Sequence, residues 1–176
     1  GWIAILLVLG LVGGTVWTEY SKSRAQQQAQ NWGDAVLAAQ KDGDPVAALG
    51  AVDSMDNAGR KALSEMLAAG AEADAGQTQQ AAERLKAAAA GVTDDPVLHD
   101  LAMLKAVMVA GPAMDAAERD QILSALSKPG APYELLALEQ KAVALIGAGR
   151  NEDAITLIGQ IQQKDGLSEP LRRRLS

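Results

Sequence analysis

Residues 96–111 read PVLHDLAMLKAVMVAG, and residues 132–149 repeat the pattern as PYELLALEQKAVALIGAG. Each copy opens with proline, carries Lys-Ala-Val nine residues later and closes in glycine. Proline suits the first turn of a helix, and glycine suits the position after the last turn. Each copy therefore predicts one helix.

Each copy is followed by a second predicted helix, over about residues 115–127 and 152–164. The same pairing occurs upstream as a helix over 57–75, a glycine at position 76, and a helix over 78–90. The prolines that precede successive helices lie 36 and 38 residues apart, at Pro96, Pro132 and Pro170. A period of this length built from helix pairs indicates a helical solenoid, because one pair buries its apolar face only against its neighbours.

The composition favours an all-α fold. Apolar residues make up 48 % of the 176-residue chain, yet aromatic residues make up only 3 % and phenylalanine is absent. Much of the apolar fraction is alanine, the strongest helix former, and no segment alternates as a strand would. The core is therefore expected to consist of thin, closely packed helices. The alanines expected at close helix contacts are Ala81, Ala106, Ala142 and Ala154.

Charge and residue types argue against several function classes. A net charge of −6 without a basic, aromatic-rich face argues against a nucleic-acid partner. The chain has no cysteine, so it has neither disulfides nor thiolate chemistry. No histidine, carboxylate or serine stands in a catalytic or metal-binding pattern. The chain is therefore predicted to be no enzyme and to have no cofactor, metal or small-molecule substrate.

The N-terminal segment, residues 1–18, reads GWIAILLVLGLVGGTVWT and carries no charged side chain. As a helix it spans roughly 27 Å, close to the thickness of one hydrocarbon core. Trp2 lies near one end, and Trp17 and Tyr20 lie near the other, as in an aromatic belt at the membrane interfaces. A buried core helix would carry polar residues on one face, and a signal peptide would have a shorter apolar run and a cleavage site. The segment therefore predicts a single transmembrane anchor in a lipid bilayer.

Three glycines lie close together within this segment, at Gly10, Gly13 and Gly14. Small residues let a second membrane helix approach closely, so these glycines predict a packing face toward a partner helix. The alternative is that this face meets lipid, because glycine is common in membrane helices.

Residues 19–56 are expected to form a helical stem and a first short helix. The stem, over 19–41, carries one apolar stripe at helical spacing, formed by Ala25, Ala29, Trp32, Val36 and Ala39. Asp44-Pro45 is a typical helix start, so a short helix is predicted over 45–55. The chain is thus divided into an anchor at 1–18, a stem and short helix at 19–56, and repeats at 57–176.

The helix pairs resemble tetratricopeptide (TPR) repeats, which have small residues in the first helix, a turn glycine, and alanine with large apolar residues in the second. In the third pair these are Ala142, Leu145, Gly149, Ala154, Ile158 and Ile161; in the first they are Ala69, Gly76, Ala81, Leu85 and Ala88. The middle pair departs from the pattern, with Pro112 in its turn and Gly111 in place of the turn glycine. With its anchor and stem, the chain resembles the TPR-like family of single-pass bacterial inner-membrane proteins that includes the ancillary subunit of the Sec translocon.

This resemblance implies a non-catalytic scaffold of the inner membrane, whose TPR-like domain lies in the periplasm and binds translocon or chaperone proteins. The alternative is a permanently docked accessory subunit of another large inner-membrane complex, such as a respiratory complex. Solenoids bind partners on a concave surface, here expected to be built from first-helix side chains. The side chains expected to point outward on that surface are His99, Lys105, Glu134, Glu139 and Lys141.

We expect the full-length chain to stay with the membrane during carbonate extraction. The physical reason is that the uncharged run at 1–18 is long enough to span the hydrocarbon core and has no cleavage site. Immunoblotting of the pellet and the supernatant measures the partition. Release of the full-length chain into the supernatant would contradict the anchor.

Overall fold

The computed structural model describes the backbone of residues 2–176 and the side chains of residues 21–176. Within that part the chain is helical with short connecting turns, one of which is a single 3-10 turn, η1, at Gly111–Ala113. The prediction of an all-α fold is confirmed. The α-helices are α1 (Trp2–Ala39), α2 (Pro45–Gly50), α3 (Ala58–Asp74), α4 (Thr78–Ala90), α5 (Pro96–Ala110), α6 (Ala116–Leu126), α7 (Glu134–Gly147), α8 (Asn151–Gln162) and α9 (Glu169–Arg174).

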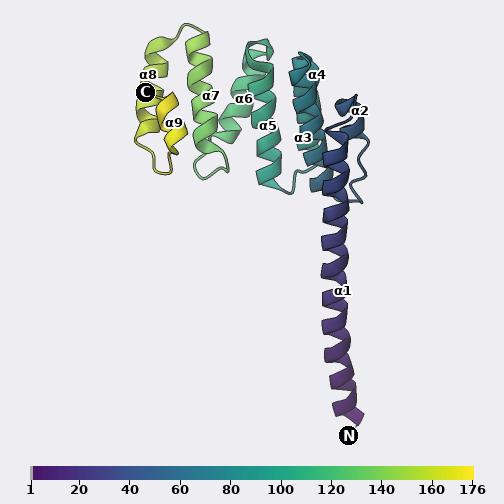
Figure 1. The fold of residues 1–176 in the computed structure, drawn as a ribbon. Coiled ribbons are helices and arrows are strands. Elements are labelled where there is room, and N and C mark those ends of the chain that lie inside the picture. The colour runs from purple at the N-terminus through teal and green to yellow at the C-terminus, as the bar shows by residue number, and fades with distance from the viewer. Residues whose placement is uncertain (1) are drawn as a thin grey trace.

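Figure 1 shows the helices from α3 to α9 as a row, with α1 extending away from one end of it. Within the row α3 packs on α4, α5 on α6 and α7 on α8, and each pair also contacts the next pair. The N-terminus lies at the far end of α1, and the C-terminus lies at the opposite end of the row. This arrangement is the helical solenoid that the repeat period predicts.

Alanine fills the contacts between the first three helices of the row. Ala69 of α3, Ala81 of α4 and Ala106 of α5 have no exposed surface and share one cluster with Met66 and Leu85. A one-carbon side chain lets two helix backbones approach closely, and the few longer side chains fill the remaining space at the density of a protein interior. The core is therefore thin, as expected from a chain without phenylalanine.

The third pair has the same kind of contact. Ala142 of α7 and Ala154 of α8 are 2 % and 1 % exposed. With Ala81 and Ala106, all of the alanines that the repeats place at helix contacts are therefore buried. The large side chain that closes this end of the core is Ile161, which packs on α9.

The turns within the first and third pairs depend on glycine. Gly76 and Gly149 have φ angles of +80° and +73°, in the left-handed region where a side chain is strained. The start of α7 differs from the predicted one, because the carbonyl of Ala131 accepts a hydrogen bond from the N–H of Glu134 at 3.2 Å. This turn contains Pro132, so the helix begins two residues later than the proline.

The helix predicted over 45–55 ends earlier, at Gly50. The side chain of Asp53 accepts a hydrogen bond from the N–H of Met55 at 2.8 Å, and such a local bond competes with helical bonding. Met55 and Asp56 then take φ angles of 53° and 58°, which interrupt any helix. As a result, α2 has only 6 residues.

The last turns of α1 pack on the repeats. Val36 and Ala39 are buried in one cluster with Leu49 of α2 and Ala68 of α3. The stem therefore joins the row through its C-terminal end.

Trp32 makes a polar contact at the same junction. Its Nε1 donates a hydrogen bond to Oγ of Ser64 in α3 at 3.2 Å. Ala25 and Ala29, which belong to the predicted stripe, are exposed. Most of α1 extends beyond the row of helices and has no other helix beside it (Figure 1). Only the C-terminal half of the stripe is therefore a packing surface within this chain.

The predicted anchor falls outside the residues whose side chains the structure describes. This applies to the interface aromatics Trp2, Trp17 and Tyr20 and to the glycines Gly10, Gly13 and Gly14. In the described remainder of the chain, no helix combines the length and the apolar character needed to cross a membrane. The anchor at 1–18 thus stays a prediction.

Replacing Ala142 or Ala154 by leucine is expected to lower the melting temperature of the chain. Both positions are almost fully buried, so the added carbons overpack the contact between α7 and α8 by about 1–3 kcal/mol. Thermal denaturation followed by circular dichroism measures the change. Ala125→Leu, at an exposed position of α6, adds the same carbons at the surface and is the matched control. Melting curves that match the control for both buried positions would argue against this tight interior.

Candidate functional site

Helix α5 is apolar on almost all sides. Of its 15 residues, only His99, Asp100 and Lys105 are polar or charged. A surface helix of a globular protein normally carries a polar face opposite its buried stripe. Instead, α5 exposes Val97 by 51 % and Met108 by 56 %. These two residues are eleven positions apart, about three turns, and so lie on the same side of the helix.

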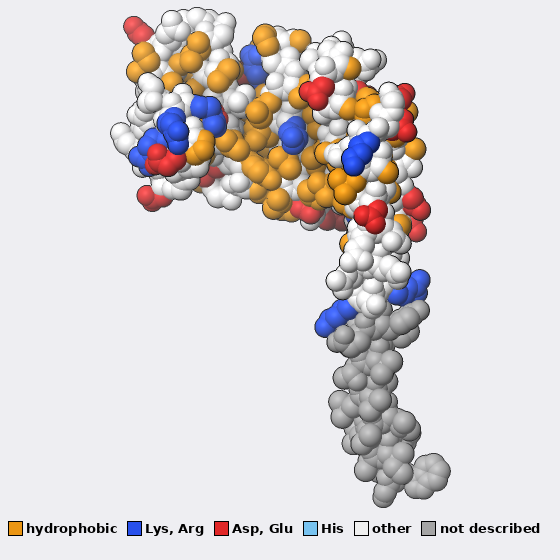
Figure 2. Space-filling view, in the orientation of Figure 1, with side chains coloured by type: hydrophobic (Ala, Val, Ile, Leu, Met, Phe, Trp, Pro, Cys, Tyr) orange, Lys and Arg blue, Asp and Glu red, His pale blue; other side chains and the backbone are white. Residues whose placement is uncertain are grey.

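The first helices of the neighbouring pairs add further exposed apolar side chains. They are Leu67 of α3, at 37 %, and Leu136, Val143 and Ile146 of α7, at 36 %, 54 % and 53 %. Figure 2 shows hydrophobic side chains gathered over α5 and the adjoining part of α3, with few charged groups among them. We call Leu67, Val97, Met108, Leu136, Val143 and Ile146 the apolar face. Exposed apolar patches mark interaction sites in soluble domains, and the side chains gathered over α5 form such a patch.

Three of the side chains predicted to face a partner reach the surface. Lys105 is exposed, three residues before Met108 on α5. His99 and Lys141 are half-buried. Nδ1 of His99 lies 2.9 Å from Oδ1 of Asp100, so the histidine is engaged by its neighbour in sequence. Whether these three residues contact a partner stays a prediction.

The expectation that Glu139 points outward is corrected. Glu139 is only 8 % exposed, because Arg174 of α9 lies against it. Nε and Nη2 of Arg174 donate to the two carboxylate oxygens of Glu139, a paired geometry that suits guanidinium and carboxylate groups. The hydrogen bonds from Arg174 to Glu139 raise the pKa of Arg174. The pair is 35 residues apart in sequence, one repeat length, and ties α9 to α7.

Glu134 is also occupied by the C-terminal part of the chain. Its carboxylate accepts hydrogen bonds from Nζ of Lys164 at 2.8 Å and from the N–H of Gly130 at 2.9 Å. These bonds, chiefly the one from Lys164, lower the pKa of Glu134. Glu134 therefore holds the start of α7 against the end of α8, and its carboxylate is not free for a partner.

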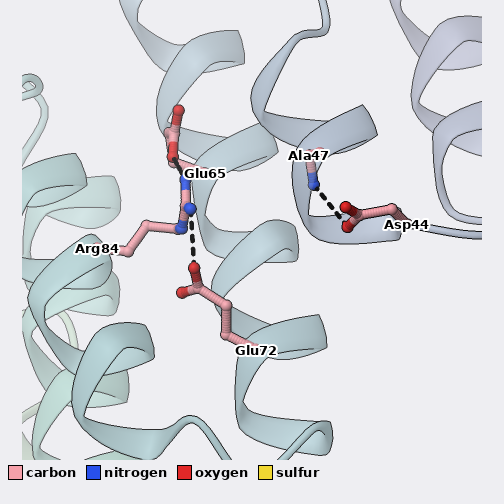
Figure 3. A network of polar contacts seen from close by, with 5 residues as sticks. All are labelled: Asp44, Ala47, Glu65, Glu72 and Arg84. Carbon is pink, nitrogen blue, oxygen red and sulfur yellow. Dashed lines mark hydrogen bonds and ion pairs between the residues drawn. The ribbon is translucent and has the colours of Figure 1, made fainter.

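A second polar centre lies between α3 and α4, and the sequence-based predictions do not include it. Figure 3 shows the guanidinium of Arg84 between the carboxylates of Glu65 and Glu72. Nη1 of Arg84 donates to Glu65 at 2.6 Å, and Nη2 donates to Glu72 at 2.8 Å. Glu72 is only 5 % exposed, and the pKa of Arg84 is raised, first of all by its hydrogen bond to Glu72.

This network is incompletely bonded. Oε2 of Glu72 and Nε of Arg84 are both buried and have no hydrogen-bond partner in the described part of the chain. A buried polar atom without a hydrogen-bond partner destabilises the fold, because it has lost the hydrogen bonds that it makes with water in the unfolded chain. Glu65 and Glu72 are seven residues apart and so share one side of α3, a spacing that is visible in the sequence. Their partner, Arg84, belongs to α4, so the sequence alone does not reveal the pairing. It depends on the register in which α3 packs against α4.

The Glu65–Glu72–Arg84 network lines one side of an open groove between α3 and α4, with a volume of about 900 Å³. The remainder of the lining is mostly small or amide side chains. The small residues are Ala58, Ala62, Ala87, Ala88 and Gly91, the amides are Gln79 and Gln80, and two further charged side chains are Lys61 and Glu83. Among the described residues, no three His, Cys, Asp or Glu side chains gather in a way that could hold a metal ion.

Comparison with known proteins identifies one family. A family model described as a tetratricopeptide repeat-like domain matches residues 1–158 of this chain. No curated protein and no solved structure matches this chain. The match covers α1 and the row of helices into α8.

Replacing Arg84 by methionine is expected to destabilise the chain by about 3 kcal/mol. The substitution keeps an unbranched apolar stem but leaves two carboxylates, one of them almost fully buried, without their cation. Arg150→Met removes an exposed pair with Asp153 and is the matched control, expected to cost less than about 1 kcal/mol. Thermal or urea denaturation followed by circular dichroism measures both. Equal stabilities for the two variants would mean that the network does not hold α3 to α4.

Proposed function

The chain belongs to the tetratricopeptide repeat-like family, and we propose that it is a membrane-anchored scaffold that binds other proteins on its apolar face. A repeat domain of this kind indicates a protein-interaction scaffold without catalytic activity. The observation that carries the proposal is the exposure of Val97 and Met108 on a helix that is apolar nearly all round. A bound protein surface would remove these side chains from water.

Contacts of this kind contribute to the free energy of binding in proportion to the apolar area that they bury. Burying one exposed Val, Leu, Ile or Met side chain gains about 1.5–3 kcal/mol, and the side chains of the apolar face are one-third to one-half exposed. Each would therefore contribute about 1 kcal/mol. A few such residues at the centre of an interface supply most of its affinity, and Lys105 beside Met108 would add orientation through charge.

We propose further that residues 1–18 anchor the chain in the bacterial inner membrane. The uncharged run and its flanking aromatics support this, as does the resemblance to the family that includes the ancillary subunit of the Sec translocon. The free part of the stem after the anchor, residues 19–31, would hold the repeats roughly 20 Å beyond it. Partners in the same membrane, such as the translocon, or periplasmic chaperones would then meet the apolar face at raised effective concentration.

We expect Val97→Glu and Met108→Glu each to reduce copurified protein roughly fivefold or more, since the lost contact of about 1 kcal/mol is a factor of roughly five in affinity and the buried carboxylate adds to the loss. The full chain is extracted in mild detergent, and quantitative mass spectrometry measures the proteins retained. Both positions are exposed, so the fold should tolerate the change. The matched control is Ala125→Glu, at an exposed position of α6.

Three outcomes are informative. Loss of the same proteins from both variants but not from the control supports binding on the apolar face. Equal retention in all variants would refute it. One complex retained at fixed ratio by every variant would instead indicate a permanently docked accessory subunit, held through another surface.

A further inference from the structure

The groove between α3 and α4 lies where a repeat array would place a longer second helix. The second helices α4, α6 and α8 have 13, 11 and 12 residues, whereas α2, which precedes α3, has 6. The second helices α4 and α6 are linked by an ion pair, in which Nζ of Lys86 in α4 donates to Glu118 of α6 at 2.8 Å. The second helix that precedes α4 along the chain is the short α2.

The end of α2 coincides with the Arg84 network. A Cβ atom built on Gly50, the last residue of α2, would lie 3.7 Å from Nη1 of Arg84. Beyond Gly50 the chain turns away through Asp53 and the positive-φ residues that follow. The groove is therefore the space that two further turns of α2 would otherwise cover, and four alanines are among its lining residues. Side chains this small let a helix approach the α3 and α4 backbones closely.

The charges in the groove are unbalanced in one direction. The lining of the groove carries three carboxylates, Glu65, Glu72 and Glu83, and two cations, Lys61 and Arg84, so its net charge is −1. Glu83, with a 64 % exposed side chain, also pairs with Lys86 of α4. The whole chain has a net charge of −6, which also favours a basic partner.

The unbonded atoms indicate where a second cation would act. Arg84 uses Nη1 for Glu65, and as a result its Nε and Oε2 of Glu72 are both left without a partner. If another cation neutralised Glu65, Arg84 could bind Glu72 through Nε and Nη2 together. That two-point geometry is the one guanidinium and carboxylate groups favour, and it satisfies both buried atoms.

We propose that this groove is a second docking site, which takes a helix of a partner protein that places an arginine or lysine against Glu65. The partner helix completes the truncated second helix of the array, and its cation completes the network. The inference rests on the proposed scaffold function for the nature of the partner, but it uses a surface distinct from the apolar face.

The test places a photo-crosslinking amino acid at Ala87, an exposed residue that lines the groove, in the full chain in native membranes. The same amino acid at exposed Ala125 is the matched control. Mass spectrometry identifies the segment that is cross-linked. The expected result is one helical protein segment with Lys or Arg at the contact, captured from Ala87 and not from Ala125. Capture of lipid, of a second copy of this chain, of a segment without a basic residue, or of nothing would overturn the proposal.

Charge substitutions in the Ala87 cross-linking chain test the role of Glu65. Glu65→Lys is expected to lower the yield about tenfold through repulsion, and Glu65→Gln, which keeps an acceptor for Arg84, should lower it in the same direction. Glu152→Lys, at an exposed position of α8, makes the same charge change elsewhere and should leave the yield unaltered. Melting curves show whether each variant is folded.

Yields unchanged by both Glu65 variants would refute the groove as a docking site. If Met108→Glu abolishes copurification in the same preparations, the scaffold function stands and only the groove inference fails. If Met108→Glu is also without effect, both fail.

Discussion

Close packing of helices through alanine is the constraint on which the rest of this structure depends. Ala69, Ala81 and Ala106 have no exposed surface at the contacts of α3, α4 and α5. Because the chain lacks phenylalanine, the interior has few side chains large enough to separate the helices. A larger residue at any of these contacts would force the backbones apart, and the displacement would pass along the array, since each pair is supported only by its neighbours.

A thin interior also leaves large apolar side chains outside. Met108 and Val143 are more exposed than buried, although they occur on helices whose other faces form the core. Such residues reduce solubility unless another surface covers them. The same feature that lets the helices pack closely thus leaves an apolar face on the first helices, and this face is the physical basis of the proposed scaffold function.

Ion pairs close the places where the repeat pattern is interrupted. At the C-terminal end, α9 is short, and Arg174 binds Glu139 where another helix pair would pack. At the N-terminal end, α2 is short, and Arg84 bridges Glu65 and Glu72 beside the resulting groove. No buried polar atom of the Arg174–Glu139 pair lacks a partner in the described part of the chain, whereas the Arg84 network has two such atoms.

The sequence by itself determined the helix pairs, their period, the turn glycines and the buried alanines, because each depends on residues within a few turns of one another. The sequence predicted the end of α2 only approximately. The hydrogen bond from the N–H of Met55 to the side chain of Asp53 competes with helical hydrogen bonds, and the spacing of apolar residues does not reveal it. Tertiary structure alone decided that Glu139 is buried and that Arg84 joins Glu65 to Glu72. These contacts join residues 12 to 35 positions apart, and their formation depends on the register and distance between packed helices. The groove has the same origin, because a missing length of helix becomes a surface only where its neighbours are in place.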